Sequence, residues 1–341
     1  IMRVLRVFQC VGAVLVGADI VQPADVLLDL YGEDIRARAY VTSDPLRGEQ
    51  MLRPDFTVPV VQSHMAESAE PARYTYAGPV FRYQDNDNGR AAQSEQVGYE
   101  VFDRGQADAI EAEIFALFHQ ILMPLGVTAS TGDVGLLVAA IEGLTTSDAR
   151  KAALRRHIWR PSRFQALLAR FSQPVRAKAL GAGGQQIGLR DASDVELRLL
   201  QLVDEAAAPP IPQFEIEALN DLLEVKDHLP EALAQLQALV WRLPAIAFAV
   251  DHMAARLAAL TSAGLDVSQI GFEAAYGLTA MEYYDGFVFG FYAQHAGWPA
   301  VASGGRYDAL TRVLGQGRDV PAVGGIIRPE FTLRLSEGDL S

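Results

Sequence analysis

The sequence predicts an α+β fold in which a mostly antiparallel sheet is flanked by helices and carries an inserted helical domain. Extended segments with turn residues occur in two separated parts of the chain, at residues 19–102 and 282–327. Between them, the sequence is rich in Ala and Leu with helical periodicity. Strands in two blocks around helices are typical of α+β proteins. We therefore expect a core made of residues 1–138 and 258–341, with a helical insert at 139–257.

Composition limits the class of protein. The chain has 341 residues, of which 50% are hydrophobic and 21% charged, so it can bury a sizeable core. Its formal net charge of -13 disfavours nucleic acid as a partner, because such affinity comes largely from Lys and Arg that neutralise phosphates. The single cysteine, Cys10, suits a reducing cytoplasm, and no apolar run after residue 25 is long enough to span a bilayer. We expect a cytoplasmic protein that binds neither tRNA nor a membrane.

The N-terminal segment predicts a helix that packs on a sheet. Apolar residues with helical spacing occupy five positions: Leu5, Phe8, Val11, Val14 and Leu15. The alternative is a secretory signal, which Arg3 and Arg6 followed by apolar residues resemble. Because Arg6 and Gln9 interrupt the apolar stretch, we favour the helix.

Residues 19–62 predict extended structure. Asp44-Pro45 and Arg47-Gly48 mark a hairpin-like connection within this segment.

The next elements are a second hairpin and a helix. Residues 79–84 and 95–102 read as two strands joined by the sequence DNDNGR, in which Asn and Gly tolerate positive φ. Residues 107–123 place apolar side chains on one face and acidic residues in the first turn, which predicts a helix.

Extended sequence returns after the insert. The aromatic residues of 282–294 and the apolar residues of 321–327 predict strands, and SGGRYDAL (303–310) predicts a glycine turn between them.

Six short segments carry a resemblance to a known family. They are LRPDFT (52–57), FRYQDNDNGR (81–90), SEQVGYEVFD (94–103), MEYYDGFVFGF (281–291), SGGRYDAL (303–310) and PAVGGI (321–326). Each alone is more typical of a turn, a packed strand or a helix start than of a functional site. In this order and at these separations they resemble the catalytic core of histidyl-tRNA synthetase, a class II synthetase, and its paralogue, the regulatory subunit of ATP phosphoribosyltransferase. The resemblance covers residues 19–330 and implies a class II synthetase-like sheet.

The resemblance also implies a histidine-binding pocket. The matching positions are Asp55, Thr57, Arg82, Gln96, Glu100, Tyr283, Tyr284 and Tyr307. Asp55 and Glu100 supply anionic acceptors for an ammonium and a ring N–H, Thr57 and Gln96 add neutral polar contacts, and tyrosine rings close the pocket. The family has a glutamate where this chain has Asp55, and the shorter side chain weakens that contact. The alternative is that these residues only preserve a folded sheet.

Departures from the family pattern point away from amino-acid activation. The loop after Arg82 offers Gln84, Asp85 and Asp87, and acidic residues repel the phosphates of ATP. The resemblance aligns Phe331 with an arginine that contacts ATP and Thr279 with an arginine that faces the activated carboxylate. Losing one donor to a developing anion costs on the order of 3 kcal/mol, so two losses make adenylation very slow. We expect a pocket that lacks two of the family's guanidinium groups and binds an amino acid without activating it.

The segment after the third motif supports the same expectation. Ten residues follow Phe331, whereas an anticodon-binding domain needs on the order of 100. We therefore expect no charging of tRNA.

Other chemistry has no sequence signal. The six histidines show neither HExxH nor paired metal-ligand spacing, and no Walker loop or GxSxG elbow is present. GAGGQQIG (181–188) has the wrong spacing for a dinucleotide loop and is expected to be a loop of the insert. We expect no catalytic residue, no metal and no cofactor.

These observations lead to one main hypothesis and two alternatives. The resemblance implies a non-catalytic regulatory subunit of ATP phosphoribosyltransferase in histidine biosynthesis, which enables a short catalytic subunit and mediates allosteric feedback by histidine. It further implies a homodimer, formed through exposed apolar surface, within a hetero-octamer. The histidine site lies either in the synthetase-like pocket or at the subunit contact. The alternatives are a divergent histidyl-tRNA synthetase or histidine-adenylate-forming enzyme, and a plain scaffold with a vestigial pocket.

Overall fold

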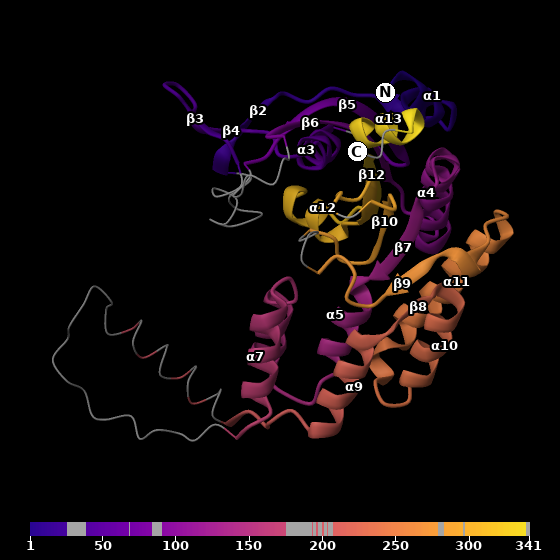
Figure 1. The fold of residues 1–341 in the computed structure, drawn as a ribbon. Coiled ribbons are helices and arrows are strands. Elements are labelled where there is room, and N and C mark those ends of the chain that lie inside the picture. Colours follow the sequence, from indigo (N-terminus) through magenta and orange to yellow (C-terminus); the bar gives the residue numbers. More distant parts are fainter. Residues whose placement is uncertain are drawn as a thin grey trace.

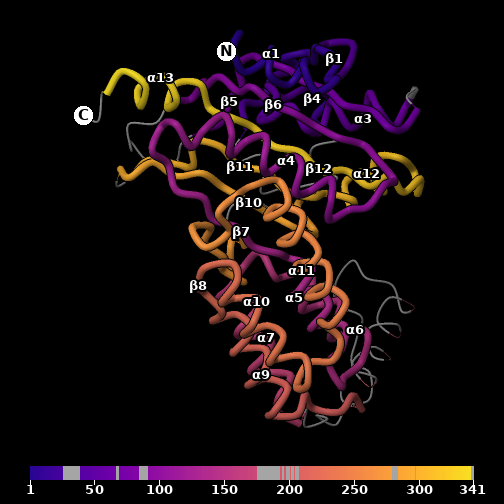
Figure 2. Tube along the Cα trace, turned by 90° about the vertical axis from the view of Figure 1, so that its right-hand side faces the viewer, coloured from indigo at the N-terminus to yellow at the C-terminus, as the bar shows by residue number. Residues whose placement is uncertain are grey.

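A mostly antiparallel sheet with helices packed on it forms the molecule, and helices from the middle of the chain gather at one end (Figure 1). The computed structural model describes residues 1–25, 39–67, 69–83, 91–174, 207–278, 283–295 and 297–338, together with single positions 193, 196, 200, 203. Figure 2, turned by 90°, shows the same division, with α1 and α13 at the end opposite to α9 and α10. The predicted α+β class is therefore confirmed.

The described residues form one nine-stranded sheet. Its strands, in spatial order, are β1 (Val14–Leu15), β5 (Ala72–Phe81), β6 (Gln93–Phe102), β12 (Ala322–Ile327), β11 (Ala302–Arg306), β10 (Phe287–Tyr292), β7 (Thr128–Asp133), β9 (Gly271–Glu273) and β8 (Lys226–His228). Only the β1–β5 and β7–β9 pairs are parallel. The centre of the sheet brings β6 beside β12, so the two parts of the predicted core meet there.

Helices cover one face of this sheet. Along β6, successive side chains point to opposite faces. Tyr99 stacks on Phe8 of α1 (Met2–Cys10), with ring centroids 5.0 Å apart, while Phe118 of α4 (Ala107–Leu122) packs against Phe289 of β10. The predicted first helix on a sheet and the predicted helix at 107–123 are both confirmed. The opposite face of β6, which carries Glu100, is therefore the face that can build a site.

The first helix is shorter than expected. It ends at Cys10, and Val14–Leu15 form the edge strand β1, so the expectation that these two residues continue the helix was wrong. Gly12 has a φ of 91°, a left-handed conformation that ends a helix and that glycine adopts readily.

A small sheet precedes the main one. It consists of β2 (Val21–Pro23), β4 (Gly48–Leu52) and β3 (Val41–Asp44), and the β3–β4 hairpin confirms the predicted connection. The expectation of extended structure up to residue 62 was wrong, because α3 (Thr57–Glu67) begins at Thr57. The amide of Val58 donates to Asp55 Oδ1 at 3.3 Å, which satisfies one of the free N–H groups of the helix start.

The paired strands of the main sheet follow the prediction with two exceptions. The β5–β6 hairpin, β10 and β12 confirm that strands form in these segments, but β5 runs from Ala72 to Phe81 instead of over 79–84. Residues 303–306 form part of β11, so the prediction of a glycine turn there was wrong. This segment is hydrogen-bonded to β10 on one side and to β12 on the other, and α12 (Asp308–Leu314) follows it. The predicted loops at 85–90 and 181–188 lie outside the described residues.

Helices dominate the chain between β7 and β9. They are α5 (Val134–Glu142), α6 (Asp148–Arg156), α7 (Pro161–Phe171), α9 (Gln213–Glu224), α10 (Leu229–Leu239) and α11 (Ala247–Ser262). Arg256 of α11 donates to Glu111 of α4 and, at 2.9 Å, to Asp133 of β7, and all three side chains are buried. This ion cluster ties α11 to the sheet. The division of the chain at 138 and 257 stays a prediction.

Candidate functional site

A cavity of about 790 Å³ opens on the face of the sheet opposite to α1 and α4. Strands β6, β11 and β12 supply its floor, and residues 297–300 together with α13 (Pro329–Glu337) supply part of its wall. Six of the eight predicted site residues line it: Asp55, Thr57, Arg82, Gln96, Tyr283 and Tyr284. Segments from both halves of the chain therefore build one cavity, as the resemblance implied.

Asp55 and Thr57 supply polar groups where the chain enters α3. Both side chains are buried. Asp55 accepts from the Val58 amide, and Thr57 Oγ1 donates to Glu100 Oε1 at 3.1 Å. An anionic carboxylate beside hydroxyl groups is suited to an ammonium ligand.

Glu100 lies behind the cavity wall and does not line the cavity. Its oxygens accept three hydroxyl donors, from Thr57, from Tyr76 at 2.8 Å and from Tyr307 at 2.6 Å. Burial raises the pKa of Glu100 to about 7, opposed by the three hydroxyl donors and reinforced by Asp55. The structure therefore places Glu100 and Tyr307 in a buried cluster next to the cavity. A ring N–H of a ligand would have to replace one of these donors.

Two glycines give this cluster its room. A Cβ on Gly98 would lie 2.0 Å from Tyr76 Cζ, and one on Gly324 would lie 1.6 Å from Glu100 Oε2. Both glycines lie on the central strands β6 and β12, on the same face as Glu100. A side chain at either position would displace the acid or the tyrosine that binds it.

Tyrosine rings form part of the cavity wall. The rings of Tyr283 and Tyr284 lie 4.5 Å apart, and Tyr307 is 6.3 Å from each of them. Burial raises the pKa of Tyr283 to about 12, with Asp55 adding to the effect, so its hydroxyl stays protonated at neutral pH. The three tyrosines pack as a cluster in which Tyr283 and Tyr284 line the cavity, and their closure of a histidine pocket stays a prediction.

Gln96 carries an orphan acceptor in the cavity. The residue is 2% exposed, and its Oε1 has no hydrogen-bond partner. A buried amide oxygen without a donor is costly, so a ligand with an N–H group would satisfy it.

Among the described residues, three arginines line the cavity. Arg328 and Arg334, which were not predicted as site residues, lie there together with the predicted Arg82. Arg82 Nε donates to the carbonyl of Pro54 at 2.9 Å. Burial, and then the neighbouring Arg82, lowers the pKa of Arg328 to about 10, which leaves it charged at neutral pH. A signal was available: Arg328 follows the apolar strand directly and precedes a proline that starts a helix.

Aromatic side chains flank the arginines. Phe331 lines the cavity and packs on Trp298, with ring centroids 4.9 Å apart. The guanidinium of Arg334 lies over the Trp298 ring at 4.6 Å. The position aligned with an ATP-contacting arginine of the family is therefore an apolar part of the wall. Thr279, Gln84, Asp85 and Asp87 lie outside the described residues.

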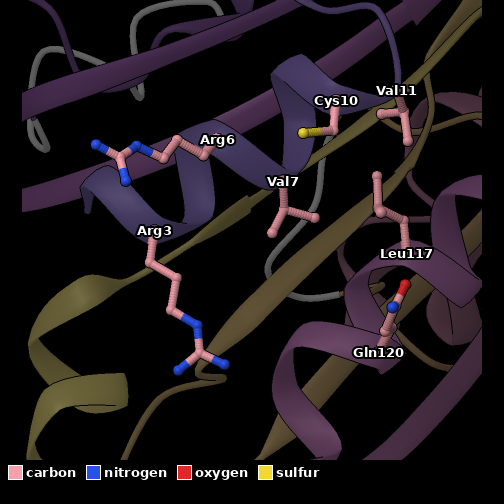
Figure 3. A pocket seen from close by; sticks show the side chains of 7 residues that line it. All are labelled: Arg3, Arg6, Val7, Cys10, Val11, Leu117 and Gln120. Carbon is pink, nitrogen blue, oxygen red and sulfur yellow. The ribbon is translucent and has the colours of Figure 1, made fainter.

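A second pocket lies between α1 and α4 (Figure 3). It is lined by Arg3, Arg6, Val7, Cys10, Val11, Leu117 and Gln120. In Figure 3 the two arginine side chains extend away from Val7 and Leu117, which leaves a mostly apolar surface. None of the predicted site residues lines this pocket.

Clusters of metal ligands and membrane-spanning helices are both absent from the described residues. Across the ranges given above, no group of three or more His, Cys, Asp or Glu side chains is placed to hold a metal ion. In the same part of the chain, no helix combines the length and the apolar character that crossing a bilayer requires.

Comparison with known proteins gives a consistent result. Residues 1–331 match the family model described as histidyl-tRNA synthetase. Proteins named ATP phosphoribosyltransferase regulatory subunit are similar over most of both chains: that of Mesorhizobium japonicum is 30% identical, covering 94% of this chain and 93% of its own, and that of Brucella anthropi is 30% identical, covering 92% and 90%.

Solved structures share the fold. A protein of Bacillus halodurans, described as an ATP phosphoribosyltransferase regulatory subunit/histidyl-tRNA synthetase, has a TM-score of 0.69 and 20% identity over 100% of this chain and 78% of its own. The histidyl-tRNA synthetase of a Nostoc species has a TM-score of 0.66 and 18% identity, covering 99% and 71%.

Proposed function

This chain belongs to the histidyl-tRNA synthetase family, and from that premise we propose that it is a regulatory subunit of ATP phosphoribosyltransferase. It would join a short catalytic subunit, enable its activity and carry the histidine that inhibits the assembly. The observation that carries the proposal is the similarity, over nine-tenths or more of both chains, to proteins named as such subunits.

The cavity supports histidine as the effector. It combines the buried carboxylate of Asp55, the orphan oxygen of Gln96 and the guanidinium groups of Arg82, Arg328 and Arg334. An α-amino acid has an ammonium and a carboxylate that match these anionic and cationic groups. We place the effector here rather than at a subunit contact. Histidine then regulates by binding one state of the assembly better than the other, and a coupling of about 1–3 kcal/mol is sufficient.

Loss of amino-acid activation is part of the proposal. Phe331 and Trp298 form an apolar surface where the resemblance implied an arginine for ATP. Without a cation at that position, the developing charge on a phosphate is not stabilised.

The three arginines on the cavity wall favour a second candidate function, a histidine-adenylate-forming enzyme. Histidine-dependent exchange of pyrophosphate into ATP separates the two. We expect no exchange above background from the full chain. Robust exchange would show that Arg328 and Arg334 have taken over the role of the replaced residues, and would contradict the regulatory proposal.

A reconstitution tests the regulatory function directly. The full chain is mixed with the short-form catalytic subunit of the same organism, and the formation of phosphoribosyl-ATP is followed with and without histidine. We expect the two proteins to co-elute in size-exclusion chromatography, the rate to rise, and histidine to inhibit only when this chain is present. A catalytic subunit that neither binds this chain nor changes its rate would overturn the proposal.

A further inference from the structure

Arg328 lies beside Gln96 at the point where two central strands enter the cavity. The β6–β12 register pairs Val97 with Ile327, so its continuation by one residue sets Arg328 opposite Gln96. Residues opposite each other in an antiparallel pair project to the same face. Both residues line the cavity. The guanidinium of Arg328 and the unpaired amide oxygen of Gln96 therefore lie next to each other on the floor of the cavity.

The backbone and side chain of Arg328 are both anchored. Its amide donates to the carbonyl of Val301 at 2.9 Å, which continues the β11–β12 ladder by one bond. Its Nη1 donates to the carbonyl of Ala300 at 2.6 Å. Pro329 then starts α13. The guanidinium is therefore held in place before any ligand binds, which lowers the entropy that binding must cost.

Its charge is not neutralised by an ion pair. Within the described ranges, no carboxylate lies within 4.0 Å of the Arg328 nitrogens, the limit that defines the ion pairs found elsewhere in the chain. Glu330 acts on Arg328 from a longer distance, and Arg82 acts on it with the opposite sign. Arg328 is half-buried and Arg82 is exposed, and two cations that repel each other are stabilised when an anion binds between them.

Tyr283 lies close to both the acidic and the basic residues of the cavity. Asp55 and Arg82 both act electrostatically on the Tyr283 hydroxyl, and Tyr283 acts on Arg328. One ring is therefore bordered by an anion and by two cations. A small zwitterion fits this arrangement better than a phosphate, because Glu330 and Asp55 would repel a second negative charge.

We propose that Arg328, together with Arg82, forms a carboxylate subsite, which makes an α-carboxylate a requirement for ligand binding in this cavity. The inference rests on the proposed function, in which the ligand is histidine. It assigns a specificity-determining role to Arg328: the subsite discriminates histidine from amines that carry the same imidazole ring. A planar guanidinium can bind a carboxylate through two parallel hydrogen bonds, which an ammonium group cannot.

Isothermal titration calorimetry on the full chain tests this subsite. Histidine is compared with histamine, which has the ring and the ammonium but no carboxylate. The variants are Arg328→Gln, Arg328→Lys and the control Arg312→Gln, whose exposed side chain lies on α12 and pairs with Asp319. Thermal unfolding of each variant checks that the fold is retained, since Arg328→Gln also loses the bond to Ala300.

We expect Arg328→Gln to weaken histidine binding about 10- to 100-fold, the usual loss for a hydrogen-bonded charge, and to leave the weaker binding of histamine unchanged. Arg328→Lys should recover part of the loss, and Arg312→Gln should bind as the wild type does. Equal effects of Arg328→Gln on both ligands, or no effect on histidine, would overturn the subsite alone. No histidine binding by the wild-type chain would instead overturn the effector site of the proposed function, and this inference with it.

Discussion

Tyr307 donates a hydrogen bond of 2.6 Å to Glu100, although 207 residues separate the two in the chain. Thr57 and Tyr76 donate to the other carboxylate oxygen. The acid thus binds α3, β5 and the start of α12 to the middle of the sheet. Glu100 therefore contributes to the stability of the core beside the cavity.

Replacement of Glu100 by Gln should change how stability depends on pH. Burial raises the pKa of Glu100 from its ordinary 4.5 to about 7, so the folded chain holds this proton more tightly than the unfolded chain does. Its contribution to stability is full below 4.5 and is lost as the pH rises through about 7. Ionisation of Glu100 in the fold therefore costs on the order of 3 kcal/mol. We expect the free energy of unfolding, measured with urea, to fall less between about pH 4.5 and pH 8 in Glu100→Gln than in the wild type.

Asp285 also makes the free energy of unfolding fall as the pH rises, because burial raises its pKa to about 6. The test therefore compares the slope of unfolding free energy against pH in the wild type with the slope in the variant. Identical slopes would show that Glu100 does not titrate in this range.

Replacement of Gly98 by Ala tests the packing of the buried cluster. A Cβ at this position would lie 2.0 Å from Tyr76, which is fully buried and cannot move without losing its bond to Glu100. Overpacking of this kind destabilises by about 1–3 kcal/mol. The matched control is Gly17→Ala, since no atom lies within 4 Å of a Cβ there. Circular dichroism should show a lower melting temperature for Gly98→Ala only, and equal melting of both variants would contradict this packing.

The sequence predicts most of the elements whose signal is local. The hairpin around Asp44-Pro45 and the amphipathic helix of 107–123 form as predicted. Both depend on signals that act over a few residues, namely turn chemistry and helical periodicity. The end of the first helix does not follow its apolar spacing, since Gly12 interrupts the helix and leaves Val14 to pair with Tyr74 of β5. Long-range pairing determined the structure of that segment.

The candidate site shows the same limit. Six of the predicted residues line the cavity, since a resemblance over the whole chain carries long-range information that periodicity lacks. Arg328 was not predicted as a site residue. Its place directly after an apolar strand was a local signal, but its position opposite Gln96 depends on the register of β12 against β6. The buried contact of Arg256 with Glu111 depends on tertiary packing, so no local sequence pattern predicts it.

Replacement of Glu111 by Gln should be strongly destabilising. Glu111 is buried and accepts from both Arg256 and Arg306, and these two cations lower its pKa against the effect of burial. Removal of the charge deprives two buried guanidinium groups of their shared partner. Because Arg256 keeps Asp133 and Arg306 keeps Asp308, we expect a cost near the lower end of the roughly 3–5 kcal/mol that a broken buried pair costs. Glu113→Gln is the control on the same helix: its carboxylate pairs with Arg73 at the surface, where such pairs contribute about 0–1 kcal/mol. Urea denaturation at neutral pH gives both values, and similar losses would show that the buried cluster does not hold α11 to α4.

Replacement of Asp55 by Asn separates the charge of the acidic end from its structural contact. An Asn side chain keeps an oxygen that can accept from the Val58 amide, which Asp55 does at 3.3 Å, so the start of α3 should be preserved. It removes the negative charge that an ammonium group would meet, and under the proposed function histidine binding should weaken about 10- to 100-fold. The matched control is Asp266→Asn, because Asp266 accepts from the Ser268 amide at 3.1 Å and does not line the cavity. Calorimetry should show no further change for imidazole propionate, a ligand that lacks the ammonium group. An equal loss for that ligand would mean that Asp55 acts through the fold instead of through direct contact.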